Sequence, residues 1–281
     1  MAHITFNFHS QVLDFHQTVH LLVPDANIYG ALAGGADTEE IPVLYLLHGL
    51  KGAAHTWTSY TSIERYLYES EKKMVVVMPE MHNNFYTDQA IGWPYLKYVA
   101  EELPRIIETY LRVSPKRENT YVAGLSMGGY GALKIGLALP EDFSVVGALS
   151  AGCDRVGILP EAVRGLSGIE ALRAAREMLD PADYARGMQF FVNFGSPAEF
   201  EQNDADNLFR LAEKAKAGGT PLPKLILRCG TEDALALGPN RRFKAHLDAL
   251  GIENDYAEFP GTHSWAFWDE HIQYVLENLP V

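Results

Sequence analysis

The amino-acid sequence predicts an α/β protein with one mostly parallel central sheet and helices on both of its faces. Short runs of unbroken apolar residues recur along the chain, and such runs are typical of strands buried on both faces. Helical stretches separate the runs, and alternating strands and helices produce a parallel sheet. The 281 residues, 47% of them apolar, can bury a large core, so we expect a single domain over residues 1–281.

Two strands are expected at the start of the chain. Between Ile4 and Phe8 apolar and polar residues alternate, and a period of two is typical of a half-exposed strand. A second strand is expected over residues 15–23, because Pro24 ends the pattern there. Residues 30–40 contain a Gly-Gly pair and several charges, so they are interpreted as a loop.

The buried strands and their helices follow. Strands are expected over residues 43–48, 74–78, 121–125, 145–149, 225–229 and 254–259. Helices are expected over residues 96–111, 130–139, 240–250 and 265–279. Ligand sites in sheets of this kind gather at the carboxyl ends of the strands. Residues that follow the apolar runs are therefore the first candidates for a functional site.

A long insertion interrupts this alternation. About residues 154–222 separate two of the buried strands, and they show helical patterns over 170–179 and 206–217 but no clear strand. We expect these residues to form a cap-like insertion over the carboxyl edge of the sheet. The segment has no linker of low complexity at either end, so a separate domain is disfavoured.

The composition argues against several classes of function. The formal net charge of −13 disfavours a nucleic-acid partner and adsorption to anionic lipid. Two cysteines, Cys153 and Cys229, are too few for a disulfide scaffold and are expected to be small buried residues. The first residues do not have the pattern of a signal peptide, and no apolar run is long enough to span a membrane. We therefore expect a cytoplasmic protein without a membrane partner.

The strongest functional signal is the segment Gly124-Leu125-Ser126-Met127-Gly128, which fits the pattern G-x-S-x-G. It lies between an expected strand and an expected helix, which is the context that a nucleophile elbow requires. The turn strains the backbone at the serine, and the flanking glycines leave room for it. The pattern predicts Ser126 as a nucleophile, although a glycine-rich turn that only permits close packing is the alternative.

A second signal lies at the end of the strand over residues 43–48. An oxyanion hole needs two backbone N–H groups, one from the residue after the nucleophile and one from the loop after an early strand. Here these residues are Met127 and Leu50. His48 is expected to have a structural role rather than to act as the base, and the alternative for the whole segment is an ordinary turn.

An acid and a base follow the last two strands. Asp233 comes after the strand at 225–229, and His263 comes after the strand at 254–259. The chain order Ser126, Asp233, His263 is the order of nucleophile, acid and base in the α/β-hydrolase fold. Two other carboxylates, Asp154 and Glu232, could also reach a histidine from a strand end, so they are tested as alternatives.

Aromatic and histidine residues supply further candidates. Tyr86, Trp93 and Trp265 are interpreted as substrate-binding residues, with plain packing as the alternative for each. Four histidines on the first two strands lack the tight spacing of a zinc site and are expected on a polar strand face: His3, His9, His16 and His20. We expect no metal.

Together these segments resemble the Putative esterase (esterase D-like) family of α/β-hydrolases, and bacterial tributyrin esterases in particular. The segments that carry the resemblance are 47–50, 84–88, 124–131, 229–233 and 263–268. The family also contains feruloyl and acetyl esterases and mycolyltransferases. The resemblance implies cleavage of acyl esters without a cofactor, with Ser126 as nucleophile, Asp233 as acid and His263 as base.

The sequence therefore predicts a serine carboxylesterase that cleaves short-chain acyl esters of small molecules through an acyl-enzyme intermediate, without a metal or organic cofactor. Acylated sugars are an alternative substrate class. Acyl transfer and hydrolysis of an S-formylglutathione-type thioester are alternative reactions, and a non-catalytic binding protein is the alternative outside enzymes. Self-association as a homo-oligomer is left open.

Overall fold

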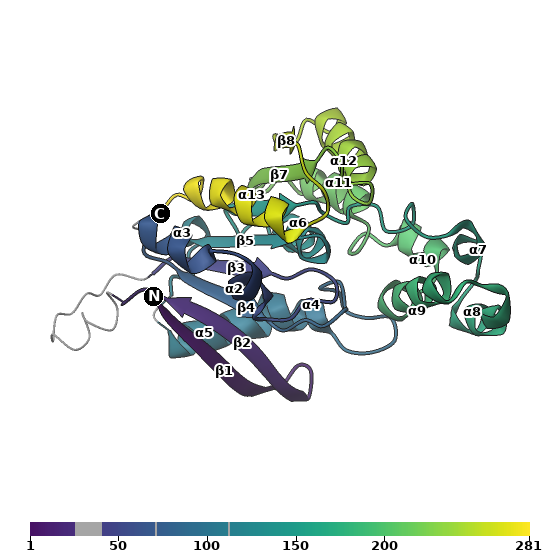
Figure 1. Cartoon of the computed structure of the whole chain (residues 1–281), viewed down its shortest axis with the longest axis horizontal. Coiled ribbons are helices and arrows are strands. Elements are labelled where there is room, and N and C mark those ends of the chain that lie inside the picture. Colours follow the sequence, from purple (N-terminus) through teal and green to yellow (C-terminus); the bar gives the residue numbers. More distant parts are fainter. Residues whose placement is uncertain (26–40, 71, 112) are drawn as a thin grey trace.

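The computed structural model describes residues 1–25, 41–70, 72–111 and 113–281, which form one eight-stranded sheet in the order β1-β2-β4-β3-β5-β6-β7-β8 (Figure 1). The strands are β1 (Ala2–Ser10), β2 (Phe15–Val23), β3 (Val43–Leu47), β4 (Val75–Pro79), β5 (Thr120–Leu125), β6 (Val145–Leu149), β7 (Lys224–Gly230) and β8 (Asp255–Phe259). Every expected strand is present, within two residues at each end. The loop expected over residues 30–40 lies outside the described residues.

The sheet is antiparallel at one edge and parallel elsewhere. β1 and β2 form a hairpin, and β2 pairs antiparallel with β4. All pairings from β4 to β8 are parallel, so the carboxyl ends of these strands lie along one edge. β3 to β7 carry the unbroken apolar runs because helices cover both of their faces. The predicted α/β-hydrolase architecture is confirmed.

Helices divide the core into two clusters, one on each face of the sheet. Along β3, Val43, Tyr45 and Leu47 belong to one cluster, and Leu44 and Leu46 belong to the other. The first face is covered by α4 (Tyr95–Lys97), α5 (Leu103–Tyr110), α6 (Met127–Ala138), α11 (Leu208–Gly218) and α12 (Leu237–Ala249). The second is covered by α2 (Thr56–Tyr60), α3 (Ile63–Glu69) and α13 (Trp265–Glu277).

Outside the insertion, three of the expected helices differ from the sequence prediction, and one of them, α6, begins at Met127, three residues before its expected start. The helix expected over 96–111 is divided into α4, a π-helical turn η1 (Tyr98–Glu102) and α5. Pro104 lies in the first turn of α5 and has no N–H to continue the hydrogen-bond ladder, which accounts for the break. α12 begins at Leu237, three residues before the expected start, because Pro239 is tolerated in a first turn.

The segment between β6 and β7 contains only helices and loops. It comprises α7 (Glu161–Arg164), α8 (Ile169–Ala174), η3 (Arg176–Met178), α9 (Pro181–Phe194), α10 (Pro197–Gln202) and α11, while η2 (Arg117–Asn119) precedes β5. Figure 1 shows α7 to α10 grouped beyond one end of the parallel strands. We call residues 154–222 the cap. The sequence prediction missed α9, although Asp180 caps it and Pro181 begins it.

A buried polar cluster fixes the cap to the helix that follows Ser126. Lys134 of α6 is fully buried and pairs with Asp206 of the cap, whose carboxylate also accepts a hydrogen bond from Thr87. Tyr130 Oη donates to the Asp206 carbonyl at 2.6 Å. Burial lowers the pKa of Lys134, and the Asp206 charge opposes that shift. Asp206 therefore joins α6, the cap and the loop after β4 near the carboxyl edge of the sheet.

None of the helices in the described ranges combines the length and the apolar character that crossing a bilayer requires.

Candidate active site

Ser126 lies in the sharp turn between β5 and α6. Its backbone has φ 52° and ψ −112°, which is strained for a residue with a side chain. A Cβ atom on Gly128 would lie 2.3 Å from the Leu47 carbonyl oxygen, and one on Gly124 would lie 2.4 Å from the Gly128 carbonyl oxygen. Both contacts are with backbone, so only glycine fits at either position. The glycines of the motif are therefore explained by the turn itself.

The structure brings Ser126, His263 and Asp233 together in one hydrogen-bonded chain. His263 Nε2 lies 2.9 Å from Ser126 Oγ, and His263 Nδ1 lies 2.7 Å from Asp233 Oδ2. An Nδ1–H that donates to the carboxylate leaves Nε2 to accept the serine proton. The Asp233 side chain is buried, whereas about a quarter of the His263 side chain is exposed at 24%. This arrangement can generate an alkoxide nucleophile at a site open to solvent.

Asp233 is held as a carboxylate by its hydrogen bonds. Burial by itself raises the pKa of Asp233, but the hydrogen bond and charge of His263 and the N–H of Ala236 together bring the pKa below its ordinary value. Asp233 Oδ1 accepts from Ala236 N–H at 2.9 Å and from Leu235 N–H at 3.1 Å. Oδ2 is thereby directed at the imidazole, which suits an orienting acid.

The two alternative carboxylates face other groups. Asp154 Oδ2 pairs with Arg242 at 2.6 Å, and its Oδ1 accepts from Gly157 N–H at 2.6 Å. Glu232 accepts from the N–H of Gly261, two residues before His263. Both carboxylate oxygens of Asp154 therefore bind groups other than the histidine. Glu232 anchors the loop that carries the histidine, a positioning role that the sequence reasoning did not assign.

The two predicted oxyanion-hole N–H groups have no protein acceptor within the described ranges. Met127 is the first residue of α6, where an N–H has no partner inside the helix. The Gly49 carbonyl accepts from His48 Nδ1 at 2.8 Å and from Gly52 N–H at 3.0 Å. Because a trans peptide directs its C=O and N–H to opposite sides, the Leu50 N–H points away from these groups. Both donors are available to a ligand.

His48 is a buried structural residue with both ring nitrogens occupied. Nδ1 donates to the Gly49 carbonyl, and Nε2 accepts from Met81 N–H at 3.1 Å. The His48 carbonyl in turn accepts from Tyr86 Oη at 2.8 Å. With a relative exposure of only 1%, the ring cannot serve as a solvent-accessible base. It fixes the peptide that carries the Leu50 N–H.

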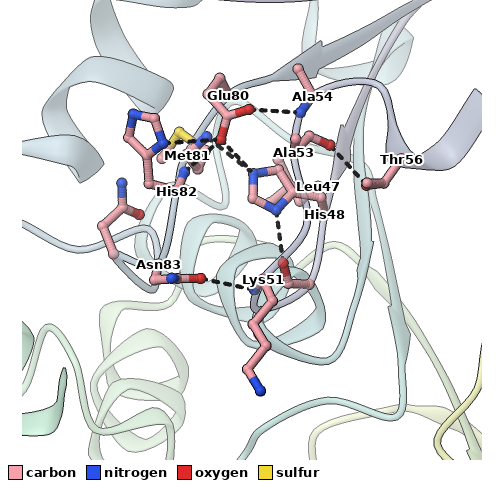
Figure 2. A network of polar contacts seen from close by, with 12 residues as sticks. Leu47, His48, Lys51, Ala53, Ala54, Thr56, Glu80, Met81, His82 and Asn83 are labelled. Carbon is pink, nitrogen blue, oxygen red and sulfur yellow. Dashed lines mark hydrogen bonds and ion pairs between the residues drawn. The ribbon is translucent and has the colours of Figure 1, made fainter. Parts of the chain in front are cut away.

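Glu80 connects the loop after β3 to the loop after β4 (Figure 2). Its carboxylate accepts from Ala54 N–H at 3.0 Å and from His82 N–H at 2.8 Å, and it lies 3.5 Å from His48 Nε2. Burial raises the pKa of Glu80, and the hydrogen bonds from the N–H groups of His82 and Ala54 oppose that shift. A second tie runs from Lys51 N–H to Asn83 Oδ1 at 2.8 Å. The Leu50 segment is therefore held from both of its ends.

This network predicts that Glu80→Gln lowers kcat for ester cleavage by about ten- to hundredfold with little change in KM, since small displacements of catalytic groups have effects of that size. In the glutamine variant, the amide N–H₂ group faces one of the two backbone N–H groups that now donate to Glu80, so that hydrogen bond is lost. Steady-state kinetics on a soluble ester measures the effect. Glu69→Gln is the matched control, because Glu69 is exposed and forms an ion pair with the equally exposed Arg65. A folded Glu80→Gln protein with normal kcat would contradict this role.

The predicted substrate-binding aromatics occupy three different settings. Tyr86 is fully buried, its hydroxyl is used by His48, and its ring fills the space beside Gly131, so the prediction that it contacts substrate is wrong in this structure. Trp93 is 51% exposed and packs edge-on against Phe15 at 5.4 Å. It stays a candidate for contact with a ligand.

Trp265 is separated from His263 by the ring of Trp268. It packs against Trp268 at 5.3 Å between ring centroids, and Trp268 packs edge-on against His263 at 4.9 Å. Trp268 is therefore the aromatic residue that supports the base. The sequence gives one indication of this role, because Trp268 follows His263 by five residues and lies in the first turn of α13.

Metal-binding and thiol chemistry find no support in the described ranges. There, no group of three or more histidine, cysteine, aspartate or glutamate side chains is arranged to hold a metal ion. His3 and His20 contact each other across the β1–β2 hairpin at 2.8 Å. Cys153 and Cys229 are free and buried, as expected. Burial raises the pKa of the Cys229 thiol to about 12, which makes it unreactive at neutral pH.

Comparison with known proteins agrees with this geometry. Residues 10–278 match the model of the family described as Putative esterase. An acetyl esterase of Caldicellulosiruptor saccharolyticus is 29% identical over 278 residues, which cover 99% of this chain and 97% of the relative. The fluorophosphonate-binding serine hydrolase FphF of Staphylococcus aureus superposes with a TM-score of 0.79 at 28% identity, covering 98% of this chain and 97% of that one.

A second solved structure, the S-formylglutathione hydrolase FrmB of Staphylococcus aureus, superposes with a TM-score of 0.77 at 27% identity over 98% of this chain and 97% of its own. The family match covers almost the whole chain, and these relatives share its fold throughout. The chain therefore belongs to the Putative esterase family of α/β-hydrolases, and it is a carboxylesterase.

Proposed function

We propose that the protein hydrolyses short-chain acyl esters through an acyl-enzyme intermediate on Ser126, with His263 as the base and Asp233 as the acid. The observation that carries this proposal is the hydrogen-bonded chain from Ser126 Oγ through His263 to Asp233. Nucleophile, base and orienting carboxylate lie within hydrogen-bond distance in the order that acyl transfer to a serine requires.

The reaction proceeds in two halves. His263 Nε2 takes the proton of Ser126 Oγ as the oxygen attacks the ester carbonyl, and the N–H groups of Leu50 and Met127 stabilise the oxyanion. His263 then gives the proton to the leaving alkoxide, which leaves an acyl group on the serine. Water attacks this acyl group with His263 again as the base, and the acid departs. No metal or organic cofactor takes part in these steps.

A short acyl group is supported by the character of the cap. Its large apolar side chains Phe190, Phe191, Phe194 and Phe200 are buried and pack against one another at 5.0–6.2 Å between ring centroids. They fill the interior of the cap instead of lining an open acyl tunnel. The similarity to a protein named acetyl esterase points to the same substrate class. Acetylated sugars are the alternative within this class.

We expect kcat/KM to be highest for p-nitrophenyl acetate or butyrate and to fall through octanoate to laurate, because the phenylalanines of the cap pack against one another and not around an acyl chain. The panel is measured at concentrations below micelle formation, with the Ser126→Ala protein as the background. A steady rise from acetate to laurate would contradict the proposal. Faster cleavage of acetylated sugars than of simple butyrate would favour the sugar alternative.

Thioester hydrolysis is the second candidate, because FrmB is similar over nearly the full length of both chains. The same serine chemistry cleaves an oxygen ester and a thioester. S-formylglutathione and a formyl ester of a simple alcohol, assayed side by side, separate the two. A preference of at least about 100-fold for the thioester in kcat/KM, as expected for a site built to hydrogen-bond its substrate, would make it the better assignment. Acyl transfer is tested by adding competing alcohols and analysing the products.

A further inference from the structure

One buried cation near the site has no use in the mechanism above. Arg155 follows β6 and is only 9% exposed, yet it donates no hydrogen bond and forms no ion pair with any other described residue. Its Nε is fully buried without a partner. The carboxylate of the adjacent Asp154 forms its ion pair with Arg242 and accepts a hydrogen bond from Gly157 N–H, and it makes no hydrogen bond with Arg155. The guanidinium lies over the face of the Phe85 ring, 3.9 Å from the ring centroid.

The side chain of Arg155 lies close to the backbone of the elbow that carries Ser126. It reaches from the end of β6 to Phe85, which follows β4, and the strands between these two in the sheet are β5 and β3. Those strands end at Ser126 and at the Leu50 loop. A Cβ atom on Gly152 would lie 3.4 Å from Arg155 Nη1 and 3.8 Å from the Ser126 carbonyl oxygen. The guanidinium is therefore next to the elbow.

Arg155 and His263 lie on opposite sides of the site. Phe85 and Tyr130, next to the arginine, belong to the core cluster on the α6 face, whereas Trp268, which supports His263, belongs to the cluster on the α13 face. His263 must protonate the leaving alkoxide, so the alcohol part of an ester lies toward the α13 face. The acyl part then extends toward the α6 face, where Arg155 lies.

The chemistry of a guanidinium defines the ligand. Burial lowers the pKa of Arg155 to about 10, so it stays charged at neutral pH. An unpaired buried charge is costly, and the Phe85 ring offsets only part of that cost. A carboxylate satisfies the planar fork of the guanidinium with two parallel hydrogen bonds. In a chain with a net charge of −13, one unpaired cation beside the nucleophile favours an anion at that position.

We propose that Arg155 binds a carboxylate at the far end of the acyl group, so that the preferred substrates are hemiesters of short dicarboxylic acids. The inference rests on the proposed function and narrows its substrate class. The acid released would be a dicarboxylate such as succinate or glutarate. Arg155 is thus a specificity-determining residue, and hydrolysis itself follows the steps already described.

The test compares two esters that differ only in charge: monomethyl glutarate and the methyl ester of glutaric acid monoamide. Methanol release gives kcat/KM for each, and their ratio is the readout. We expect the wild-type protein to prefer the acid, and Arg155→Gln to reduce the ratio by about ten- to hundredfold, mainly through KM of the acid. Arg155→Lys should keep part of the preference. Arg173→Gln, which removes an exposed arginine of the cap paired with Glu170, should leave the ratio unchanged.

A ratio that is equal in the wild-type protein and in Arg155→Gln would overturn the inference, as would an equal effect of Arg173→Gln. If the variant does not fold, inhibition of the wild-type protein by free acids and amides tests the inference instead. Free glutarate should inhibit cleavage of p-nitrophenyl acetate competitively and more strongly than glutaramide, and equal inhibition would also refute the proposal. Failure of the wild-type protein to cleave the monoamide ester and p-nitrophenyl acetate would instead contradict the proposed function.

Discussion

Replacing Ser126 with alanine is expected to lower kcat for short acyl esters by roughly 10⁴-fold or more while the protein stays folded. The hydroxyl is the nucleophile that His263 Nε2 contacts at 2.9 Å, so its loss removes the covalent route. The residual rate would come from the oxyanion hole and substrate binding alone. Initial rates with p-nitrophenyl acetate measure the effect, and thermal unfolding of both proteins checks that the fold is intact.

A reactive phosphonate probe gives an independent readout of the same residue. It should label the wild-type protein at Ser126 and leave the Ser126→Ala variant unlabelled. His263→Ala should do comparable harm to kcat, and the double variant should be little worse than either single variant, because the residues act as a unit. Additive losses, or normal turnover in a folded Ser126→Ala protein, would refute the assignment of the nucleophile.

Asp233→Asn should lower kcat by roughly 10⁴-fold near neutral pH with KM almost unchanged. The carboxylate accepts the Nδ1 proton of His263 at 2.7 Å and so selects the tautomer that leaves Nε2 unprotonated. An asparagine amide can donate to Nδ1, which favours the opposite tautomer and blocks proton transfer from Ser126. The expected loss therefore appears in the chemical step.

Asp154→Asn is the matched comparison, since Asp154 also follows a strand end but pairs with Arg242 at 2.6 Å. Its kcat should stay close to that of the wild-type protein. If kcat falls strongly in Asp154→Asn and stays nearly normal in Asp233→Asn, then the acid has been misassigned. Glu232→Gln should fall between the two, because Glu232 anchors the His263 loop through Gly261 without contacting the imidazole.

Much of this protein could be predicted because its signals are local. The unbroken apolar runs of β3 to β7 are a direct consequence of burial on both faces, so they can be recognised without knowing the partners. The glycines around Ser126 are equally local, since the turn leaves no space for a Cβ at 124 or 128. The order of Ser126, Asp233 and His263 at strand ends could then be inferred from topology alone.

The sequence favoured Asp233 over two other carboxylates without showing which of them faces His263, and it placed Tyr86 in the wrong role. These questions depend on which side chains meet across strands that are far apart in sequence. Asp154 and Asp233 have similar local settings, and only the positions of Arg242 and His263 distinguish them. Tyr86 has the sequence setting of a cleft residue, but its hydroxyl donates to the His48 carbonyl in the core.

By itself, then, the sequence determined the strand pattern, the elbow and the order of the candidate triad, because each of these follows from neighbours along the chain or from the rules of a parallel sheet. Only the tertiary structure decided how Glu80 and His48 hold the Leu50 segment, which acid faces His263, and that the buried Nε of Arg155 has no hydrogen-bond partner among the described residues. Hydrogen bonds and ion pairs act over about 3 Å, so a side chain's partner is set by the packing of distant segments and not by its sequence neighbours.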